Sequence, residues 1–132
     1  MRYRKRRYWK YTTVDDEFYA TGIIPDSSIH TKFLSMDLEG GLTILKHYAW
    51  DGASGPTIDT PNTFFGSLIH DALYQLMRGE YIDRKKWRKR ADQILYEILR
   101  DKGMSKFRAK LWYKAVRKGA EKSSEYDIIT AP

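Results

Sequence analysis

The spacing of apolar residues changes at a glycine-rich turn, and this change constrains the fold more than any other feature. Before the turn at residues 51–56, Leu34, Met36 and Leu38 alternate with polar residues, which is the period of a half-buried strand. After the turn, apolar residues recur every three or four positions, as in amphipathic helices. We therefore predict an α+β fold, with a small N-terminal antiparallel sheet followed by three packed helices.

The clearest strands form an expected hairpin over about residues 32–48. Glu39-Gly40-Gly41 supplies a tight connection between its two apolar runs. A further short strand is expected near residues 18–21. The first 50 residues are therefore predicted to form the sheet.

Each expected helix has a start signal and a glycine after its end. The helices are expected over about residues 61–78, 84–101 and 106–118, and residues 120–132 are expected to form a polar tail. The start signals are Thr60-Pro61, Asp83 and Ser105, and the terminating glycines are Gly79, Gly103 and Gly119.

Composition limits the class of protein. A chain of 132 residues is expected to form a single domain. The absence of cysteine excludes disulfides, a cysteine nucleophile and thiolate metal sites. No apolar run approaches the length of about 18 residues that a membrane span needs, and the basic N-terminus lacks the apolar segment of a secretory signal.

Basic residues are concentrated in three stretches, and the net charge is +7. They lie in residues 2–10, 84–90 and 102–118, and such patches suit polyanions such as nucleic acid or an acidic protein surface. Residues 1–11 are expected to form a basic aromatic arm that binds nucleic acid or a protein partner. Alternatively, they form an edge strand or tail whose aromatic rings pack on the domain. The candidate nucleic-acid or partner-binding residues of this arm are Arg2, Arg4, Lys5, Arg6, Arg7 and Trp9.

The first expected helix has an unusual second face. Successive helical residues are about 100° apart. His70, Asp71 and Tyr74 therefore lie on the side of the helix opposite its aliphatic face. This pattern predicts a helix that is covered on both sides or that lines a cleft. In the third helix, by contrast, Phe107, Leu111 and Trp112 suggest an ordinary core stripe.

The candidate catalytic residues are His70, Asp71, Asp51 and Asp92, because imidazole and carboxylate groups act as acids, bases and orienting partners. The same four residues are candidate ligands of a divalent metal, the one cofactor that the sequence suggests. Ser54 and Tyr74 would support this polar cluster. The alternative is a purely structural network, in which Asp92 pairs with Arg88 or Arg78.

Several motifs together resemble a family of small phage and prophage proteins known as domain of unknown function 1353. They are Asp51-Gly52-Ala53-Ser54 with Pro56, His70-Asp71-Ala72-Leu73-Tyr74, Ala91-Asp92 after Arg88 or Arg90, and Tyr113 to Arg117 with Gly119. The resemblance covers about residues 30–119 and implies a bacteriophage or prophage source, without implying a reaction. It also implies that Asp51, Ser54, His70, Asp71, Tyr74 and Asp92 form one spatial cluster.

Three functions follow as hypotheses. The first is a phage accessory or virion-associated protein, in which the polar cluster joins sheet to helices and the basic surfaces dock on other phage structural proteins. The second is a small phage hydrolase, with or without a divalent metal, that uses His70, Asp71, Asp51 and Asp92. The third is a nucleic-acid-binding protein that uses the basic arm. Each would place the protein in the host cytoplasm or the virion.

Overall fold

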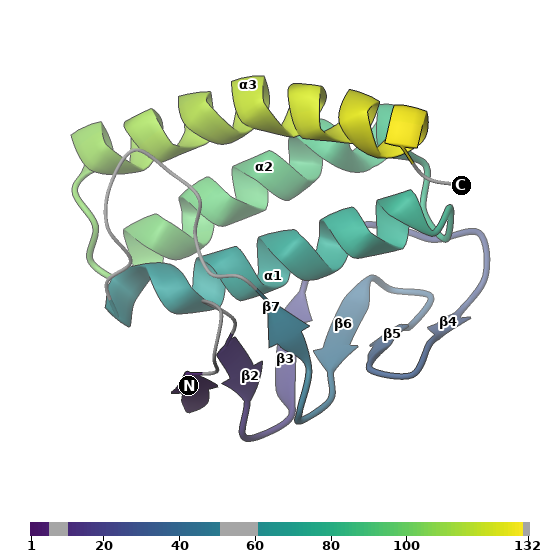
Figure 1. Cartoon of the computed structure of the whole chain (residues 1–132). Coiled ribbons are helices and arrows are strands. Elements are labelled where there is room, and N and C mark those ends of the chain that lie inside the picture. The colour runs from purple at the N-terminus through teal and green to yellow at the C-terminus, as the bar shows by residue number, and fades with distance from the viewer. Residues whose placement is uncertain (6–10, 51–60, 131–132) are drawn as a thin grey trace.

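Two small antiparallel sheets form one side of the molecule and three helices form the other (Figure 1). This computed structural model describes residues 1–5, 11–50 and 61–130, with side chains placed for 1–4, 11–50 and 63–119. The strands precede the helices along the chain. The predicted α+β class is therefore confirmed.

The first sheet joins the N-terminus to the last strand. Its strands are β1 (Tyr3–Lys5), β2 (Tyr11–Thr13) and β7 (Ala49–Trp50), in the order β1-β2-β7. Tyr3 pairs with Thr13 across the antiparallel β1–β2 ladder. The ring of Tyr3 also packs 4.3 Å from that of Phe64, between ring centroids, so this edge strand is attached to the helical layer.

The second sheet contains the predicted hairpin. Its strands are β3 (Glu17–Ala20), β4 (Ile29–His30), β5 (Leu34–Met36) and β6 (Gly41–Ile44), in the order β3-β6-β5-β4. In the β5–β6 ladder, Leu34 lies opposite Ile44 and Met36 lies opposite Leu42. All four of these side chains are buried, which places the alternating apolar face of the hairpin in the core.

The turn of this hairpin depends on Asp37 and Gly40. The Oδ1 atom of Asp37 accepts hydrogen bonds from the backbone N–H groups of Glu39, at 2.9 Å, and Gly41, at 2.8 Å. Gly40 has a φ of 90° and lies against the backbone of Ile23, so a side chain at this position would be both strained and obstructed.

The helices are α1 (Pro61–Arg78), α2 (Arg84–Asp101) and α3 (Lys106–Thr130). The first two have the predicted limits, and Asp83 caps α2 through the backbone N–H groups of Lys85 and Lys86. The prediction that Gly119 ends α3 was wrong, because the helical backbone continues to Thr130. A glycine inside a helix costs only about 1 kcal/mol, and the following Ala120-Glu121-Lys122 are good helix formers.

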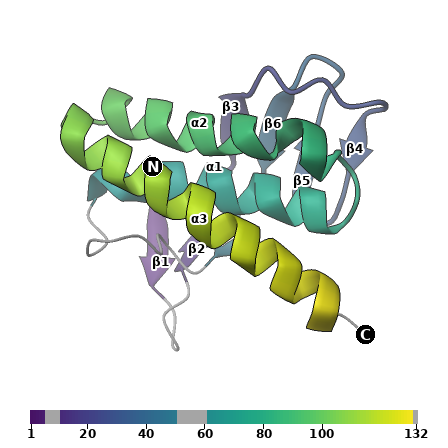
Figure 2. The same ribbon diagram turned by 90° about the horizontal axis from the view of Figure 1, so that it is seen from above.

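The α1 helix lies between the sheets and the other two helices (Figure 1), and Figure 2 shows α2 running alongside it and α3 crossing it obliquely. Its second face predicted a helix that is covered on both sides or that lines a cleft, and in the structure both sides of α1 contain buried residues. Ile69, Ala72 and Leu73 are fully buried, and His70 is 8% exposed. Among the described residues, no helix has both the length and the hydropathy needed to cross a membrane.

The third helix is rotated relative to the prediction from its apolar pattern. Trp112 and Ala109 are buried as core residues, whereas Phe107 is 73% exposed and Leu111 is 39% exposed. The expected core role of Phe107 and Leu111 was therefore wrong. The physical reason is that α3 packs through a narrow stripe of Ala109, Trp112 and Val116, which leaves the adjacent side of the helix without a partner in the described structure.

Candidate functional site

A fully buried carboxylate, that of Asp92 on α2, lies at the centre of the candidate site. Its Oδ1 atom is 2.6 Å from Nε2 of His70 and accepts a 2.7 Å hydrogen bond from the hydroxyl of Tyr74. Its Oδ2 atom accepts a 2.7 Å hydrogen bond from Nη1 of Arg117. We call these four residues the Asp92 network. All three helices contribute to it.

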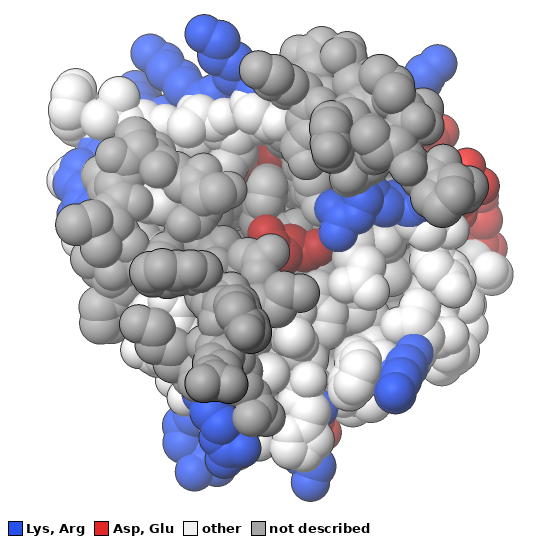
Figure 3. Space-filling view, viewed as in Figure 1, with Lys and Arg blue, Asp and Glu red and all other residues white. Residues whose placement is uncertain are grey.

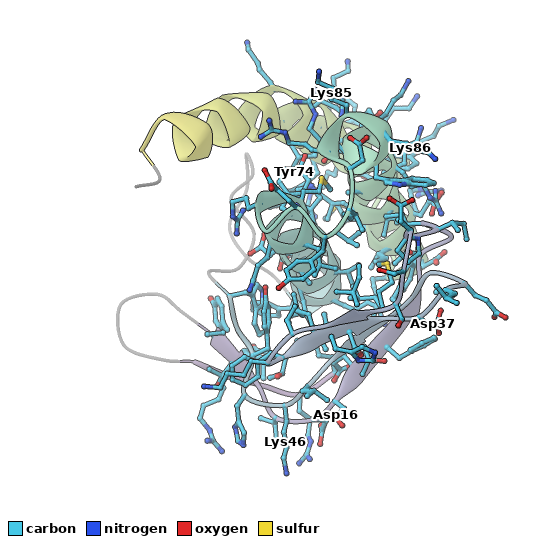
Figure 4. The ribbon with its side chains drawn as sticks, turned by 90° about the vertical axis from the view of Figure 1, so that its right-hand side faces the viewer. Asp16, Asp37, Lys46, Tyr74, Lys85 and Lys86 are labelled. Carbon is cyan, nitrogen blue, oxygen red and sulfur yellow. The ribbon has the colours of Figure 1, made fainter. Side chains whose placement is uncertain are left out.

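The α1 helix presents two members of the network because His70 and Tyr74 are four residues, or about one helical turn, apart. Their rings lie 4.3 Å apart between centroids and are tilted by 33°. Tyr74 lies on the side of α1 that faces the other helices (Figure 4). A Cβ atom at Gly66 would lie 3.0 Å from Leu95, so the glycine permits the close approach of α1 and α2 beside the network.

The start of α1 is also fixed to the sheet. The indole Nε1 of Trp50, the last residue of β7, donates a 3.1 Å hydrogen bond to Oγ of Ser67. Ser67 lies three residues before His70 and is buried. The end of the first sheet is therefore anchored within one helical turn of the network.

Hydrogen bonding keeps Asp92 ionised despite its burial. Burial alone would raise the pKa of this carboxyl, but the bonds from His70, Tyr74 and Arg117 reverse the effect, and its pKa lies below its usual range. Because ionised Asp92 can only accept hydrogen bonds, Nε2 of His70 must carry the proton that it shares with Oδ1. The other ring nitrogen, Nδ1, is the one that does not contact Asp92.

The pKa values of Tyr74 and Arg117 are shifted upward, in the opposite direction to that of Asp92. Burial, followed by the charge and hydrogen bond of Asp92, raises the pKa of Tyr74 far above its ordinary value. Burial lowers the pKa of Arg117, but the hydrogen bond and charge of Asp92 outweigh this and raise it. Tyr74 therefore remains a protonated donor, and Arg117 remains a cation.

The network brings together three of the residues that the sequence singled out, namely His70, Tyr74 and Asp92. Asp71 is half-buried at the next position of α1. Asp51 and Ser54 lie outside the described residues, so their place in the cluster stays a prediction. On the face seen in Figure 3, acidic side chains lie at the centre in a hollow, beside a group of basic side chains.

A family model described as "Protein of unknown function (DUF1353)" matches residues 30–116. The chain belongs to the DUF1353 family. No curated protein and no solved structure showed a significant match to it. The part of the chain that matches DUF1353 includes His70, Tyr74 and Asp92 and ends one residue before Arg117.

Sequence reasoning missed the role of Arg117 in this DUF1353 protein. The structural alternative paired Asp92 with Arg88 or Arg78, whereas the cation at Oδ2 comes from Arg117 on α3. Arg117 is the last residue of the Tyr113–Arg117 motif that carried the family resemblance. That motif was the available signal, but the sequence does not show which helix faces Asp92.

The suggested metal site can be followed only in part, because its candidate ligand Asp51 lies outside the described residues. Among the side chains described, those of residues 1–4, 11–50 and 63–119, no group of three or more His, Asp or Glu gathers as metal ligands. Both oxygens of Asp92 accept hydrogen bonds, and Nε2 of His70 is directed at one of them. These two residues are thus arranged to bind each other.

Two of the N-terminal candidates, Arg2 and Arg4, have described side chains. Arg2 forms an ion pair with Asp15, with Nη2 2.5 Å from Oδ1, and Arg4 is exposed on β1. Lys5 is in β1, with its side chain outside the described set, and Arg6, Arg7 and Trp9 also lie outside it. Residues 3–5 form an edge strand whose Tyr3 packs on Tyr11 and Phe64.

Proposed function

We propose that this protein is a hydrolase in which His70 acts as a general base and Asp92 orients it. The observation that carries the proposal is the 2.6 Å contact between Nε2 of His70 and the fully buried Oδ1 of Asp92. A carboxylate that holds one imidazole nitrogen fixes the tautomer and leaves the other nitrogen free to accept a proton. His70 retains a side chain that is 10% exposed, whereas Asp92 is sealed from solvent.

The expected chemistry follows from this orientation. Nδ1 of His70 takes a proton from a water molecule, and the water oxygen attacks the electrophilic carbon or phosphorus of an ester. The resulting imidazolium is stabilised by Asp92 and returns its proton to the departing alkoxide. One water is consumed, and an acid and an alcohol are released. A positioned general base of this kind contributes about 10²- to 10⁴-fold to the rate.

Water is the proposed nucleophile because the nearest described serine on α1 is already engaged. Ser67 Oγ donates a 3.0 Å hydrogen bond to the carbonyl of Phe64 and accepts the indole N–H of Trp50. Tyr74 donates its hydroxyl proton to Asp92 and has a raised pKa, which makes it a poor nucleophile.

The test is a comparison of ester hydrolysis by the wild type and by His70→Gln. Glutamine retains a donor that can reach Asp92 but has no basic nitrogen. We expect turnover of p-nitrophenyl carboxylic esters or phosphodiesters to fall at least about 100-fold. His30→Gln is the matched control, because His30 is exposed on β4 and should leave the rate unchanged. Equal rates for wild type and His70→Gln, or no turnover of either substrate class by the wild type, would refute the proposal.

A second candidate function is docking on an acidic partner through α3, and it is favoured by the composition of residues 106–119. This stretch contains six Lys or Arg and no Asp or Glu. Phe107, Lys110, Leu111, Lys114 and Lys118 are all exposed there and fall on one side of the helix. Lys85 and Lys86 extend from the outer side of the helical layer (Figure 4).

Heparin serves as a defined polyanion for testing this docking surface. Retention of the double variant Lys110→Gln/Lys114→Gln should end at a lower salt concentration than that of the wild type, because fewer counterions are displaced. A Lys32→Gln/Lys46→Gln protein has the same change in net charge, placed on the sheet side, and is the control. Equal elution of the two double variants would exclude α3 as the docking surface. A phage or prophage origin of the partner stays a prediction.

A further inference from the structure

The charges of the Asp92 network suggest a specific role for Arg117. Asp92 carries one negative charge and is fully buried, so it needs a positive partner. Arg117 supplies that charge at Oδ2, at 2.7 Å and from α3, while His70 occupies Oδ1 from α1. The positive charge of Arg117 thus balances the negative charge of Asp92, and no charge on His70 is needed for this.

We propose that Arg117 is a positioning residue of the His70–Asp92 pair, which neutralises Asp92 so that His70 rests as an uncharged base with its N–H on Nε2. This inference rests on the proposed function, because only a general base needs a neutral imidazole. With Arg117 present, the network balances at zero net charge. Without it, the buried carboxylate is left with His70 as its hydrogen-bonded candidate counter-ion, and the imidazole takes up a proton that blocks its action as a base.

The charged and titratable groups around His70 come from all three helices. Asp92 faces it from α2, Tyr74 stacks on it from α1, and Arg117 lies across the carboxylate on α3. Asp71 is the next residue of α1. Arg88, on α2, acts on Tyr74 through its charge without a hydrogen bond to Asp92. It therefore offers a nearby arginine for comparison.

The geometry also makes the pair dependent on α3. Arg117 is the residue through which α3 reaches Asp92, and it lies past the main α2–α3 contact formed by Ala109 and Trp112. The side chain of Arg117 is 29% exposed, so its outer part meets solvent while Nη1 reaches the buried oxygen. If this part of α3 moved and Arg117 lost its contact with Asp92, the protonation of His70 would therefore change as well.

Nitrogen-15 NMR of histidine-labelled protein near neutral pH tests this role without a substrate. A neutral ring has widely separated Nδ1 and Nε2 signals, whereas an imidazolium has two similar ones. The chain has three histidines, and His70→Gln assigns the relevant pair. We expect wild type, Arg117→Lys and the control Arg88→Gln to have neutral His70 with the proton on Nε2. In Arg117→Gln the ratio of charged to neutral His70 should rise at least about 10-fold, equivalent to about 1.4 kcal/mol.

Two results would overturn the role of Arg117: a neutral His70 in folded Arg117→Gln, or an imidazolium in the wild type. If Arg117→Gln does not fold in buffer, the spectrum is recorded in trimethylamine N-oxide, which favours the compact state. A charged His70 in Arg117→Lys would also overturn it, because that variant keeps the positive charge.

Hydrolysis of the ester substrates is a separate readout. Neutral His70 without ester turnover refutes the proposed reaction, whereas turnover with neutral His70 in Arg117→Gln refutes the role of Arg117.

Discussion

Among the described residues, two Arg–Asp pairs have similar contact distances and very different surroundings. Arg2 and Asp15 form a two-pronged pair near the N-terminus, at 2.5 and 2.6 Å. Arg117 and Asp92 meet at 2.7 Å between α3 and α2. The side chains of the first pair are 71% and 42% exposed, whereas Asp92 in the second is 0% exposed.

The difference shows that environment, and not distance, decides what an ion pair does. Water already solvates both members of the exposed pair, so bringing them together changes the free energy of unfolding little. Asp92 has lost its water and depends on its donors, so each donor becomes important. In both pairs the pKa of the carboxyl is lowered. For Asp15 the main cause is the Arg2 hydrogen bond, and for Asp92 burial opposes the shift and several hydrogen bonds reverse it.

The largest expected effect separates the two pairs most clearly. Asp92→Ala leaves the buried side of Arg117, His70 and Tyr74 without their acceptor, and we expect the free energy of unfolding to fall by about 3 kcal/mol. Urea denaturation followed by circular dichroism measures this loss. Asp15→Ala is the matched control in the exposed pair. A loss below about 1 kcal/mol for Asp92→Ala would mean that the two environments are not energetically different.

Removing one neutral donor should have a smaller effect. Tyr74→Phe keeps the ring that stacks on His70 but deletes the 2.7 Å hydrogen bond to Asp92. Hydrogen bonds to charged groups contribute about 1.5–3 kcal/mol, and the two remaining donors of Asp92 place our expectation near 1.5 kcal/mol. Tyr81→Phe, at an exposed tyrosine, is the control. Equal stability of the two variants in urea would show that the Tyr74 hydroxyl does not support the carboxylate.

The contribution of Asp92 to the free energy of unfolding should decrease as the pH falls. Because the pKa of Asp92 is lowered in the folded protein, its stabilising effect is complete above the unfolded pKa of about 3.9 and is lost as pH falls through the folded value. The difference in free energy of unfolding between wild type and Asp92→Asn should therefore shrink below about pH 4. Urea titrations at several acidic pH values measure it. A difference that grows as the pH falls would contradict an ionised Asp92.

The smallest expected effect belongs to the exposed pair. Arg2→Gln removes both hydrogen bonds to Asp15, yet we expect no measurable change in the urea midpoint at physiological salt, because water and ions replace the lost contact. Arg117→Gln is the paired measurement at the buried site and should lower the midpoint clearly. Similar midpoints for the two variants would remove the distinction between the pairs.

Local signals in the sequence predicted most of the fold. The alternation of Leu34 and Met36 and the turn at Gly40 placed the β5–β6 hairpin. Capping by Asp83 placed the start of α2. These features depend on residues close together in the chain. The end of α3 was not predictable in this way, because Gly119 is followed by residues that favour a helix and the local signals conflict.

The sequence by itself identified His70, Tyr74 and Asp92 as chemically unusual, because polar residues on a helix face that should be covered need partners. It could not identify those partners. Whether Asp92 meets Arg78, Arg88 or Arg117 depends on the rotation and crossing of three helices, which are set by packing at Gly66 and Trp112. The tertiary structure decided that α3 provides the cation, and with it the charge state in which we propose that His70 acts.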